Sequence, residues 1–287
     1  MTVGDVLDGT LRALRATFAV TALLVLLVQG PFQLLSSLAF ARVVPELSGP
    51  VDLERTLEDP AAGLDLMVRT MTVGTVSGLL GVIVNVALGA AIVWCVLRAD
   101  RGEPIAVGPA LRTAAERLVA TLGGVLLALF GATLVGVVGA VLLGLLIVVA
   151  PPLGLVLALP LVPVVLLVFA ALMYLIPPVA VVEGGGPLAT LQRVLWVIGR
   201  RLGRVLAVTF LISLLVMAIT LGLTFAMGFL AELSGPWGWV VEGATNTVVA
   251  LVSVPLTVIA ALLVYLDARI RLEGFDLELR ARGIGTA

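Results

Sequence analysis

The sequence contains no histidine and no lysine, and its single cysteine is Cys95. These absences exclude a histidine general base, a lysine nucleophile, a histidine or multi-cysteine metal site and an internal disulfide. Charged residues are also scarce, at 12% of the chain against about 25% in a typical soluble domain. The net charge of −1 gives no support to nucleic-acid binding. We therefore expect no catalytic residue, no cofactor and no metal.

Apolar residues make up 61% of the chain, and they gather in five runs that contain no charge. A helix needs about 20 such residues to cross a bilayer. The runs cover residues 16–41, 70–97, 118–182, 205–231 and 243–266. The third run is too long for one helix and is interrupted by Pro151, Pro152 and Gly154, which predict a tight turn between two helices.

The sequence thus predicts an all-α, polytopic membrane helix bundle in which six transmembrane helices form three hairpins. We expect one integral membrane domain over residues 1–287, with a cytoplasmic amphipathic helical tail at 267–287. The predicted transmembrane helices cover about residues 17–42, 70–97, 119–148, 154–181, 205–231 and 240–266.

The arginines predict the orientation, because basic residues are retained on the cytoplasmic side. All of the 17 arginines except Arg42, Arg55 and Arg69 fall on one side if both termini are cytoplasmic. We therefore expect a multi-pass protein of the bacterial cytoplasmic membrane with both termini inside. Aromatic residues expected at the headgroup levels are Trp237 and Trp239 outside and Trp94, Tyr174, Trp196 and Tyr265 inside.

A secretory signal is the alternative for the N-terminus, since Arg12 and Arg15 precede an apolar run and 39–41 is Ala-Phe-Ala. However, the run exceeds the roughly 7 to 15 residues of a signal core, and Asp5 and Asp8 interrupt the basic leader. An uncleaved first helix is the favoured interpretation.

Amphipathic segments precede the first, third and fifth predicted spans, at residues 3–18, 107–118 and 188–204. In each of them apolar residues recur every three or four positions opposite arginines, a pattern typical of a helix lying in the headgroup plane. Each hairpin is therefore predicted to follow a cytoplasmic interfacial helix that contacts membrane lipids. We favour membrane anchoring as its role over docking of a protein partner.

Two predicted spans carry small or polar residues every four positions, which allow helices to approach closely. These helix-packing residues are Gly124, Ala128, Ala132, Gly136, Ala140 and Gly144 in the third span and Ser77, Gly81, Asn85 and Gly89 in the second. We expect both ladders to face other helices, with the third span near the centre of the bundle. Homodimerisation through the third-span ladder is the alternative.

Proline interrupts the fourth span at Pro160 and Pro163 and is expected to end it at 177–178. The first span has a similar weak point at Pro31, between Gln29 and Gln33. Broken helices line some transport sites, but proline kinks are also ordinary in membrane helices. No ionisable residue falls at a predicted bilayer centre, which disfavours a proton-coupled transporter.

The C-terminal segment pairs opposite charges four residues apart, as in Asp267 with Arg271 and Arg269 with Glu273. Such pairs stabilise a helix, and the same charges could also meet a protein partner. The residues predicted at the cytoplasmic interface or at a partner are Arg193, Arg200, Arg201, Arg204, Asp267, Arg269, Arg271, Glu273 and Asp276. The glycines before Pro187 lack the lysine of a phosphate-binding loop and predict a turn.

Three segments resemble a group of bacterial six-span proteins labelled "glycerophosphoryl diester phosphodiesterase membrane domain", a family of unassigned function. The similar segments are VGDVLDGTLRALR, PPVAVVEGGGPLATLQRVLWVIGRRLGRVL and the motif Asp-x-Arg-x-Arg-x-Glu-Gly-x-Asp-Leu-Glu after Tyr265. Gln192 and Val194 stand where the family often has Arg and Ser. The label implies no activity here, because the hydrolysis it names depends on histidine and metal-binding carboxylates.

Taken together, the residues favour an integral membrane protein without catalytic machinery, acting as a scaffold or a membrane-embedded subunit with membrane lipids and a cytoplasmic protein as partners. A transport component that works with a separate ATPase is the second hypothesis, with spans one and four around a polar path. A membrane-lipid enzyme that uses carboxylates is the third.

Overall fold

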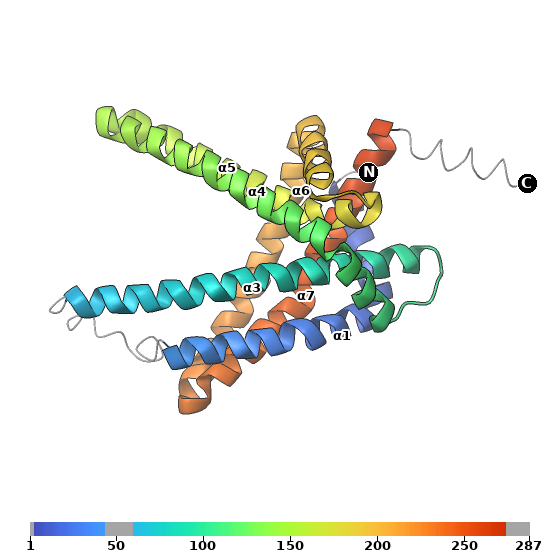
Figure 1. Cartoon of the computed structure of the whole chain (residues 1–287), viewed down its shortest axis with the longest axis horizontal. Coiled ribbons are helices and arrows are strands. Elements are labelled where there is room, and N and C mark those ends of the chain that lie inside the picture. Colours follow the sequence, from blue (N-terminus) through green and yellow to red (C-terminus); the bar gives the residue numbers. More distant parts are fainter. Residues whose placement is uncertain (1–2, 44–59, 274–287) are drawn as a thin grey trace, which may run out of the picture.

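The computed structural model describes residues 3–43 and 60–273, and within these ranges the chain is helical without any strand. The described residues form six long helices, whose arrangement is shown in Figure 1. They are α1 (Val3–Val43), α3 (Pro60–Asp100), α4 (Val107–Val149), α5 (Pro151–Glu183), α6 (Pro187–Leu233) and α7 (Gly238–Glu273), with a short 3-10 turn, η2 (Gly235–Trp237), before α7.

All six helices of the described residues are long and apolar enough to cross a membrane. Each contains one predicted span and extends beyond it, because the polar residues that flank the span are also helical. The chain is therefore a multi-pass integral membrane protein. The α7 helix continues to Glu273, so the predicted tail is helical in its first part, and residues 274–287, with Asp276, lie outside the described residues.

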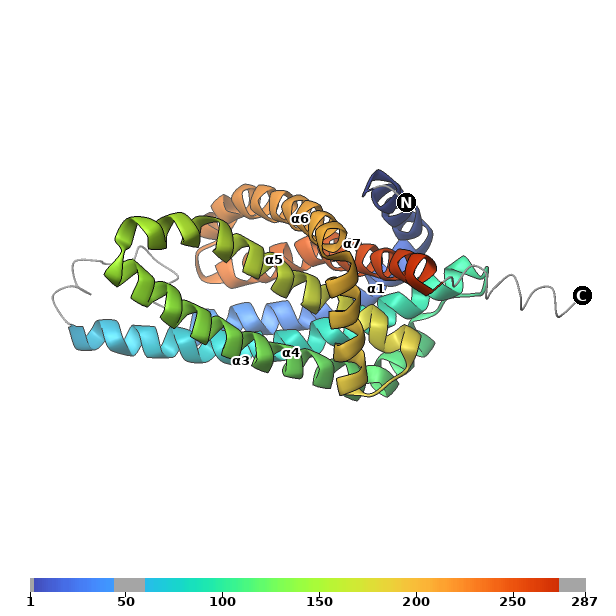
Figure 2. The same ribbon diagram turned by 90° about the horizontal axis from the view of Figure 1, so that it is seen from above.

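The connections between helices alternate between two ends of the molecule (Figure 2). The start of α1, the α3–α4 and α5–α6 connections and the end of α7 lie together, and we call this the arginine-rich end. From it three antiparallel pairs, α1–α3, α4–α5 and α6–α7, diverge toward the opposite end (Figure 1).

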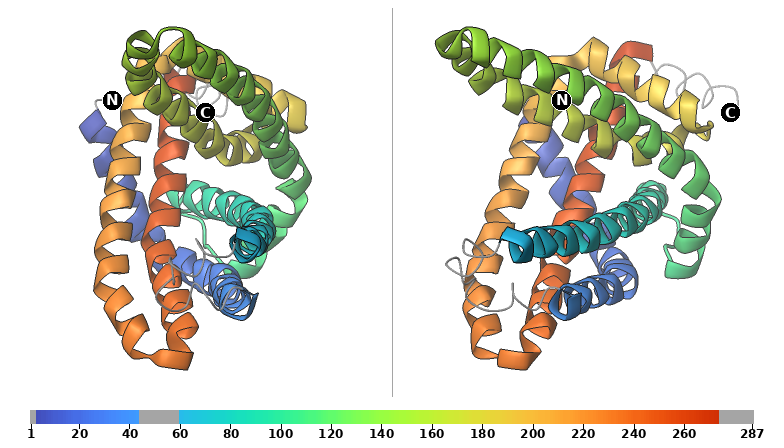
Figure 3. Two further views of the ribbon diagram at one scale, coloured as in Figure 1. Left: turned by 90° about the vertical axis from the view of Figure 1, so that its left-hand side faces the viewer. Right: turned by 60° about the vertical axis from the view of Figure 1, so that its left-hand side comes forward.

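The core lies where these pairs converge, and α3 and α7 form its centre. In each of these two helices, 56% of the most apolar 18-residue stretch is buried. No residue of the most apolar stretch of α4 is buried. Large side chains sealed in this core include Leu88, Ile92, Ile259 and Leu262. The prediction that the third span lies near the centre is wrong, because α4 leaves the other helices halfway along its length (Figure 3).

The turn between α4 and α5 is a single residue, Ala150, as expected from the two prolines that follow it. A Cβ atom on Gly154 would lie 2.8 Å from the backbone of Ile147, so only glycine fits inside this turn. At the other end of α5, Gly184 adopts a left-handed φ of 70° and ends the helix.

The α5 helix passes through Pro177 and Pro178 and ends at Glu183, close to the predicted bound of residue 181. Gly89 of α3 explains why this packing is possible, since a Cβ atom there would lie only 2.9 Å from the Pro177 ring. The absence of a side chain on α3 leaves room for that ring. Proline within a membrane helix is tolerated where a neighbour packs against it closely.

The three amphipathic segments are helical, but they join their spans differently. The α6 helix breaks at Arg201, near the end of the third segment, where φ is −134° and ψ is 28°. Most of this segment is thus set apart from the span that follows it. In α1 and α4 the amphipathic segment and the span form one continuous helix.

Candidate functional site

The arginine-rich end holds a charged network that joins α5, α6 and α7. Glu183, the last residue of α5, accepts a hydrogen bond from the hydroxyl of Tyr265 on α7. Its Oε1 also lies 3.4 Å from Nε of Arg193 and 3.8 Å from Nε of Arg269. Arg193 of α6 donates a hydrogen bond to Glu273, which Arg269 also contacts at 3.2 Å. Three helix ends are thus fixed to one another by side chains.

A second group of ion pairs lies on the same helices around Asp267. This carboxylate is almost fully buried on α7, and its Oδ2 lies 3.3 Å from Nη2 of Arg204 on α6. Its Oδ1 accepts a hydrogen bond of 3.1 Å from Nε of Arg271. The pairs four residues apart that the sequence predicts in α7 are both present, and each also has a partner on α6.

The network holds its groups in their charged forms. Partial desolvation tends to raise the pKa of Glu273, but the hydrogen bonds and charges of Arg193 and Arg269 outweigh it and lower that pKa. Desolvation likewise opposes the charge on Arg193, yet the hydrogen bond to Glu273 raises its pKa. No three carboxylates or thiols among the described residues come close enough to hold a metal ion.

Most of the residues predicted at the cytoplasmic interface have partners within the chain. Arg193, Arg204, Asp267, Arg269, Arg271 and Glu273 belong to the two groups of ion pairs described above. Arg200 lies over the ring of Trp196, 5.4 Å from its centroid, and Arg201 is the residue at which α6 breaks. Among the four arginines of α6, Arg200 is exposed, and the other three are half-buried.

Sequence reasoning missed the two residues that join α5 to α7. Tyr265 was expected at the headgroup level, but its ring is fully buried in the core and its hydroxyl meets Glu183. Glu183 was not among the residues predicted at the cytoplasmic interface. The two residues are 82 positions apart, so no local pattern could have paired them.

An open polar cavity of about 450 Å³ adjoins this network. Its lining residues are Glu183, Gly185, Ala189, Thr190, Arg193, Arg269 and Glu273. Two buried polar atoms of this lining, Oγ1 of Thr190 and Nε of Arg193, form no hydrogen bond with any described residue. Buried polar groups are normally paired, so these two atoms indicate a place where a ligand could bind.

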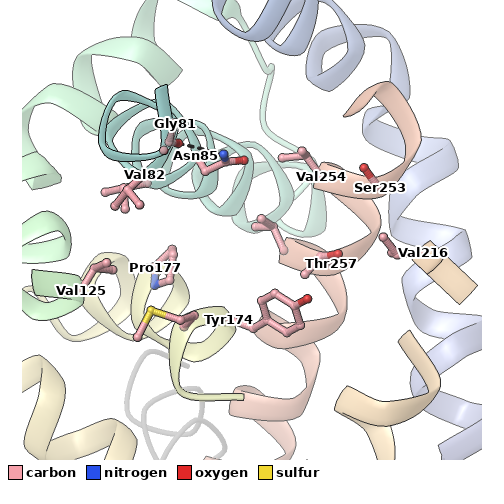
Figure 4. Close-up of a pocket in the computed structure, with 14 residues that line it drawn as sticks. Gly81, Val82, Asn85, Val125, Tyr174, Pro177, Val216, Ser253, Val254 and Thr257 are labelled. Atoms are coloured by element: carbon pink, nitrogen blue, oxygen red, sulfur yellow. Dashed lines mark hydrogen bonds between the residues drawn. The ribbon is translucent and has the colours of Figure 1, made fainter. Parts of the chain in front are cut away.

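A second cavity, of about 520 Å³, lies within the predicted membrane region where the hairpins diverge (Figure 4). Its lining is mainly apolar and comes from α3, α4, α5, α6 and α7, with Asn85, Tyr174, Ser253 and Thr257 as the residues that bring polar atoms. Asn85 donates a hydrogen bond of 2.8 Å to the carbonyl of Gly81 in its own helix. This donor of Asn85 therefore bonds its own helix while the residue borders the cavity.

The third-span ladder is divided between two environments. Gly124 and Ala128 are buried, and a Cβ atom on Gly124 would lie 3.3 Å from Ile176 of α5. Around Gly136 and Gly144 there is no atom of the described chain within 4 Å of a Cβ position. The second-span ladder is occupied at Gly81, which faces the ring of Phe32, and at Gly89, while Ser77 is half-buried. Ala132 is half-buried and Ala140 is exposed.

Spans one and four do not enclose a path together. The described helices make their principal contacts in other pairs, and α1 packs most extensively on α7. Pro160 is exposed on the outside of α5, whereas Gln29 is buried in α1 with its Oε1 unpaired among the described residues. The intramembrane cavity borders on neither residue.

The fold and its charged end define a six-helix integral membrane protein whose helix ends are tied together by ion pairs. No protein-family model, curated protein or solved structure matches the chain. The resemblance to the six-span family therefore stays a prediction carried by the residues quoted for it.

Proposed function

We propose that this protein is a non-enzymatic, membrane-embedded subunit that assembles with a helix of another membrane protein through its α4–α5 hairpin. The supporting observation is the uncovered far end of that hairpin, residues 131–166, which we call the hairpin tip. Only Gly154, inside the turn, is buried in the hairpin tip. The tip stands clear of the other helices in Figure 3.

Exposed apolar residues by themselves would indicate only contact with lipid. Whether a partner helix packs there therefore depends on where the small residues lie. Inside the membrane, helices associate through small residues that allow close approach. The buried half of the α4 ladder already packs in this way at Gly124, beside Ile176 of α5 and Thr190 of α6. The same four-residue spacing continues over Gly136, Ala140 and Gly144, where the described chain supplies no partner helix.

The hairpin tip also has a shape that suits a helix. An apolar groove of about 520 Å³ runs between its two helices, from Gly139 on α4 to Pro160 on α5. Gly139 has no side chain and that of Pro160 is small, so neither residue fills the groove. A partner helix with small or apolar residues would fill it and cover the ladder beside it.

The test replaces Gly136 and Gly144 together with leucine and measures recovery of partner proteins from native membranes. We expect the double variant to lose the partner while it remains folded, because no atom of its own chain lies near either position. Leucine at Val138 and Val141, on other faces of the tip, is the matched control. Recovery of the same partners by wild type and by the double variant would reject the proposal, and recovery of the same chain alone would indicate a homo-oligomer.

A transport component remains the second proposal, and the intramembrane cavity favours it. The cavity lies between α3, α5 and α7, so the path would differ from the one expected between spans one and four. Gly78 lines it and has no neighbouring atom within 4 Å of a Cβ position. Gly78→Phe would then reduce transport, whereas a subunit role predicts that this variant still assembles normally.

The remaining proposals concern placement. We propose that the arginine-rich end faces the cytoplasm of a bacterial cell, which the bias of arginines supports. The amphipathic segments would then lie at the inner headgroups, and Trp196 with its two neighbouring arginines would mark that level.

A further inference from the structure

The polar cavity at the arginine-rich end lies beside the short connection between α5 and α6. Three glycines, 184–186, separate the end of α5 from Pro187, the first residue of α6. Residues on both sides of this connection line the cavity, together with two residues from the end of α7. A ligand in the cavity would thus meet three helix ends at once.

Thr190 is the side chain that distinguishes this cavity from an ordinary surface hollow. It is only 1% exposed, and its hydroxyl bonds no described residue. Other buried threonines, such as Thr10 and Thr247, donate to the carbonyl four residues earlier in the helix. The backbone N–H of Thr190 donates to the carbonyl of Gly186, as in any helix, but its hydroxyl does not join that bond. An unpaired buried hydroxyl is unfavourable, so a ligand that accepts its hydrogen bond would stabilise the site.

The other unpaired group in the cavity is also a donor. Nε of Arg193 is buried and makes no hydrogen bond, although Oε1 of Glu183 lies 3.4 Å away. Thr190 and Arg193 are three residues apart on α6, so they share one face of the helix. Thr190 also stands in the first turn of α6, where backbone N–H groups lack acceptors within the helix and the helix dipole is positive.

The two acids in the lining are already engaged by other groups of the chain. Glu183 is occupied by Tyr265 and faces two arginines, while Glu273 is occupied by Arg193 and Arg269. The two acids and two arginines of the lining balance each other in charge. Arg117 lies outside this lining but beside the same connection, where its Nη1 donates to the carbonyl of Gly184 at 3.1 Å.

We propose that this cavity binds a phosphate group, with Thr190 Oγ1, Arg193 Nε and the first turn of α6 as its donors. A tetrahedral phosphate offers several acceptor oxygens, and helix N-termini with arginine are favourable places for such anions. The group has two sources with this chemistry, a phospholipid headgroup at the membrane surface and a soluble phosphate. The site is independent of the hairpin tip and of the partner proposed for it.

The experiment measures thermal unfolding of the purified full-length protein in a neutral detergent with three additives. Phosphatidylglycerol supplies a phosphate in a lipid, inorganic phosphate supplies it in solution, and diacylglycerol is the matched lipid without phosphate. We expect phosphatidylglycerol or inorganic phosphate, but not diacylglycerol, to raise the unfolding midpoint. A response to inorganic phosphate would identify a soluble source, and a response to phosphatidylglycerol alone would identify the headgroup.

The variant Thr190→Val tests whether the response comes from this cavity, because valine keeps the size of threonine and removes the donor. We expect the affinity for the phosphate compound to fall by about tenfold or more, because hydrogen bonds to charged groups contribute this much to binding. A correspondingly higher concentration would be needed for the same rise in the unfolding midpoint. Thr209→Val, on the same helix but outside the cavity, should respond like the wild type. Thr190→Ser restores the hydroxyl and should restore the response.

Equal responses of the wild type and Thr190→Val would overturn the proposal, as would the absence of any response to both phosphate compounds. Native mass spectrometry of the wild type and Thr190→Ser, with phosphatidylglycerol or inorganic phosphate added, provides a measurement that does not depend on folding of the valine variant. Specific retention of either compound supports the site. Retention of neither one contradicts it.

Discussion

At the scale of residues, two buried polar side chains of α7 determine how the arginine-rich end is held together. Tyr265 and Asp267 both point from α7 toward residues of α5 or α6. Charges near water contribute little, whereas a buried charge that loses its partner is strongly destabilising. The least exposed residues of the network should therefore contribute most to the free energy of unfolding.

Replacement of Asp267 tests this weighting. Asp267→Ala leaves Arg204 without its buried partner, and we expect a loss of about 3 kcal/mol in the free energy of unfolding. Glu116→Ala, which removes an exposed pair with Arg112, should cost about 0.5 kcal/mol or less. Reversible unfolding of both variants in mixed micelles measures the difference. Equal small losses would show that the Asp267 pairs do not stabilise the fold.

Glu273 makes the stability depend on pH in a definite direction. Its pKa in the folded protein is lowered from 4.5, so its contribution is present above that value and is lost as the pH falls through the lower, folded value. The wild type should therefore lose stability in acid more steeply than Glu273→Gln, which cannot titrate there. Unfolding midpoints of both proteins between neutral and acidic pH provide the comparison. Parallel curves would contradict the role of this carboxylate.

At the scale of elements, glycine decides where helices can turn or approach one another. The α4–α5 turn brings Gly154 against the backbone of Ile147, and α3 meets the Pro177 ring at Gly89. The sequence predicted the first feature, because proline pairs and glycine mark turns locally. It did not predict the second, which depends on two helices that are distant in the chain.

The turn glycine should be far more sensitive to substitution than the ladder glycines. Gly154→Ala places a Cβ atom 2.6 Å from Ile147 Cγ1 and 2.8 Å from its backbone, and overpacking of this kind costs about 1–3 kcal/mol. Gly144→Ala, which meets no atom of its own chain, should leave the stability of the isolated protein nearly unchanged. Unfolding of the two purified variants checks this. Equal effects would mean that the turn adapts without strain.

The number of the six helices and the position of the apolar span in each could be predicted because charge and hydropathy are local properties of the chain. The break of α6 near the end of its amphipathic segment also agrees with the change of pattern there. Burial could not be predicted in the same way, because lipid and helix interior are equally apolar. For this reason the third span, which has the most regular ladder, was placed at the centre although α4 extends away from it.

At the scale of the whole molecule, the charged and apolar ends of the structure differ in how far the chain covers their own side chains. The arginine-rich end satisfies most of its charges internally, which explains why residues predicted to meet a partner prove to hold α5, α6 and α7 together. The opposite end spreads its hairpins apart and leaves the hairpin tip uncovered. Recognition within the membrane is therefore the function that this division favours.

The orientation of the molecule can be tested with reporter fusions. Alkaline phosphatase, which is active only outside the cytoplasm, should be active when inserted after Ser48 and inactive when fused after Ala287. A fluorescent protein that matures only in the cytoplasm should give the reverse result. The opposite pattern would invert the proposed placement of the arginine-rich end.

Crosslinking from the hairpin tip in native membranes tests the central claim most directly. A cysteine at Ala140, in a Cys95→Ala background, would carry a photoreactive group on the uncovered ladder, and one at Leu166 would serve as a control at the base of the tip. We predict a discrete adduct with a second membrane protein from position 140 that Gly136→Leu and Gly144→Leu together abolish. Lipid adducts alone from position 140 would contradict the account.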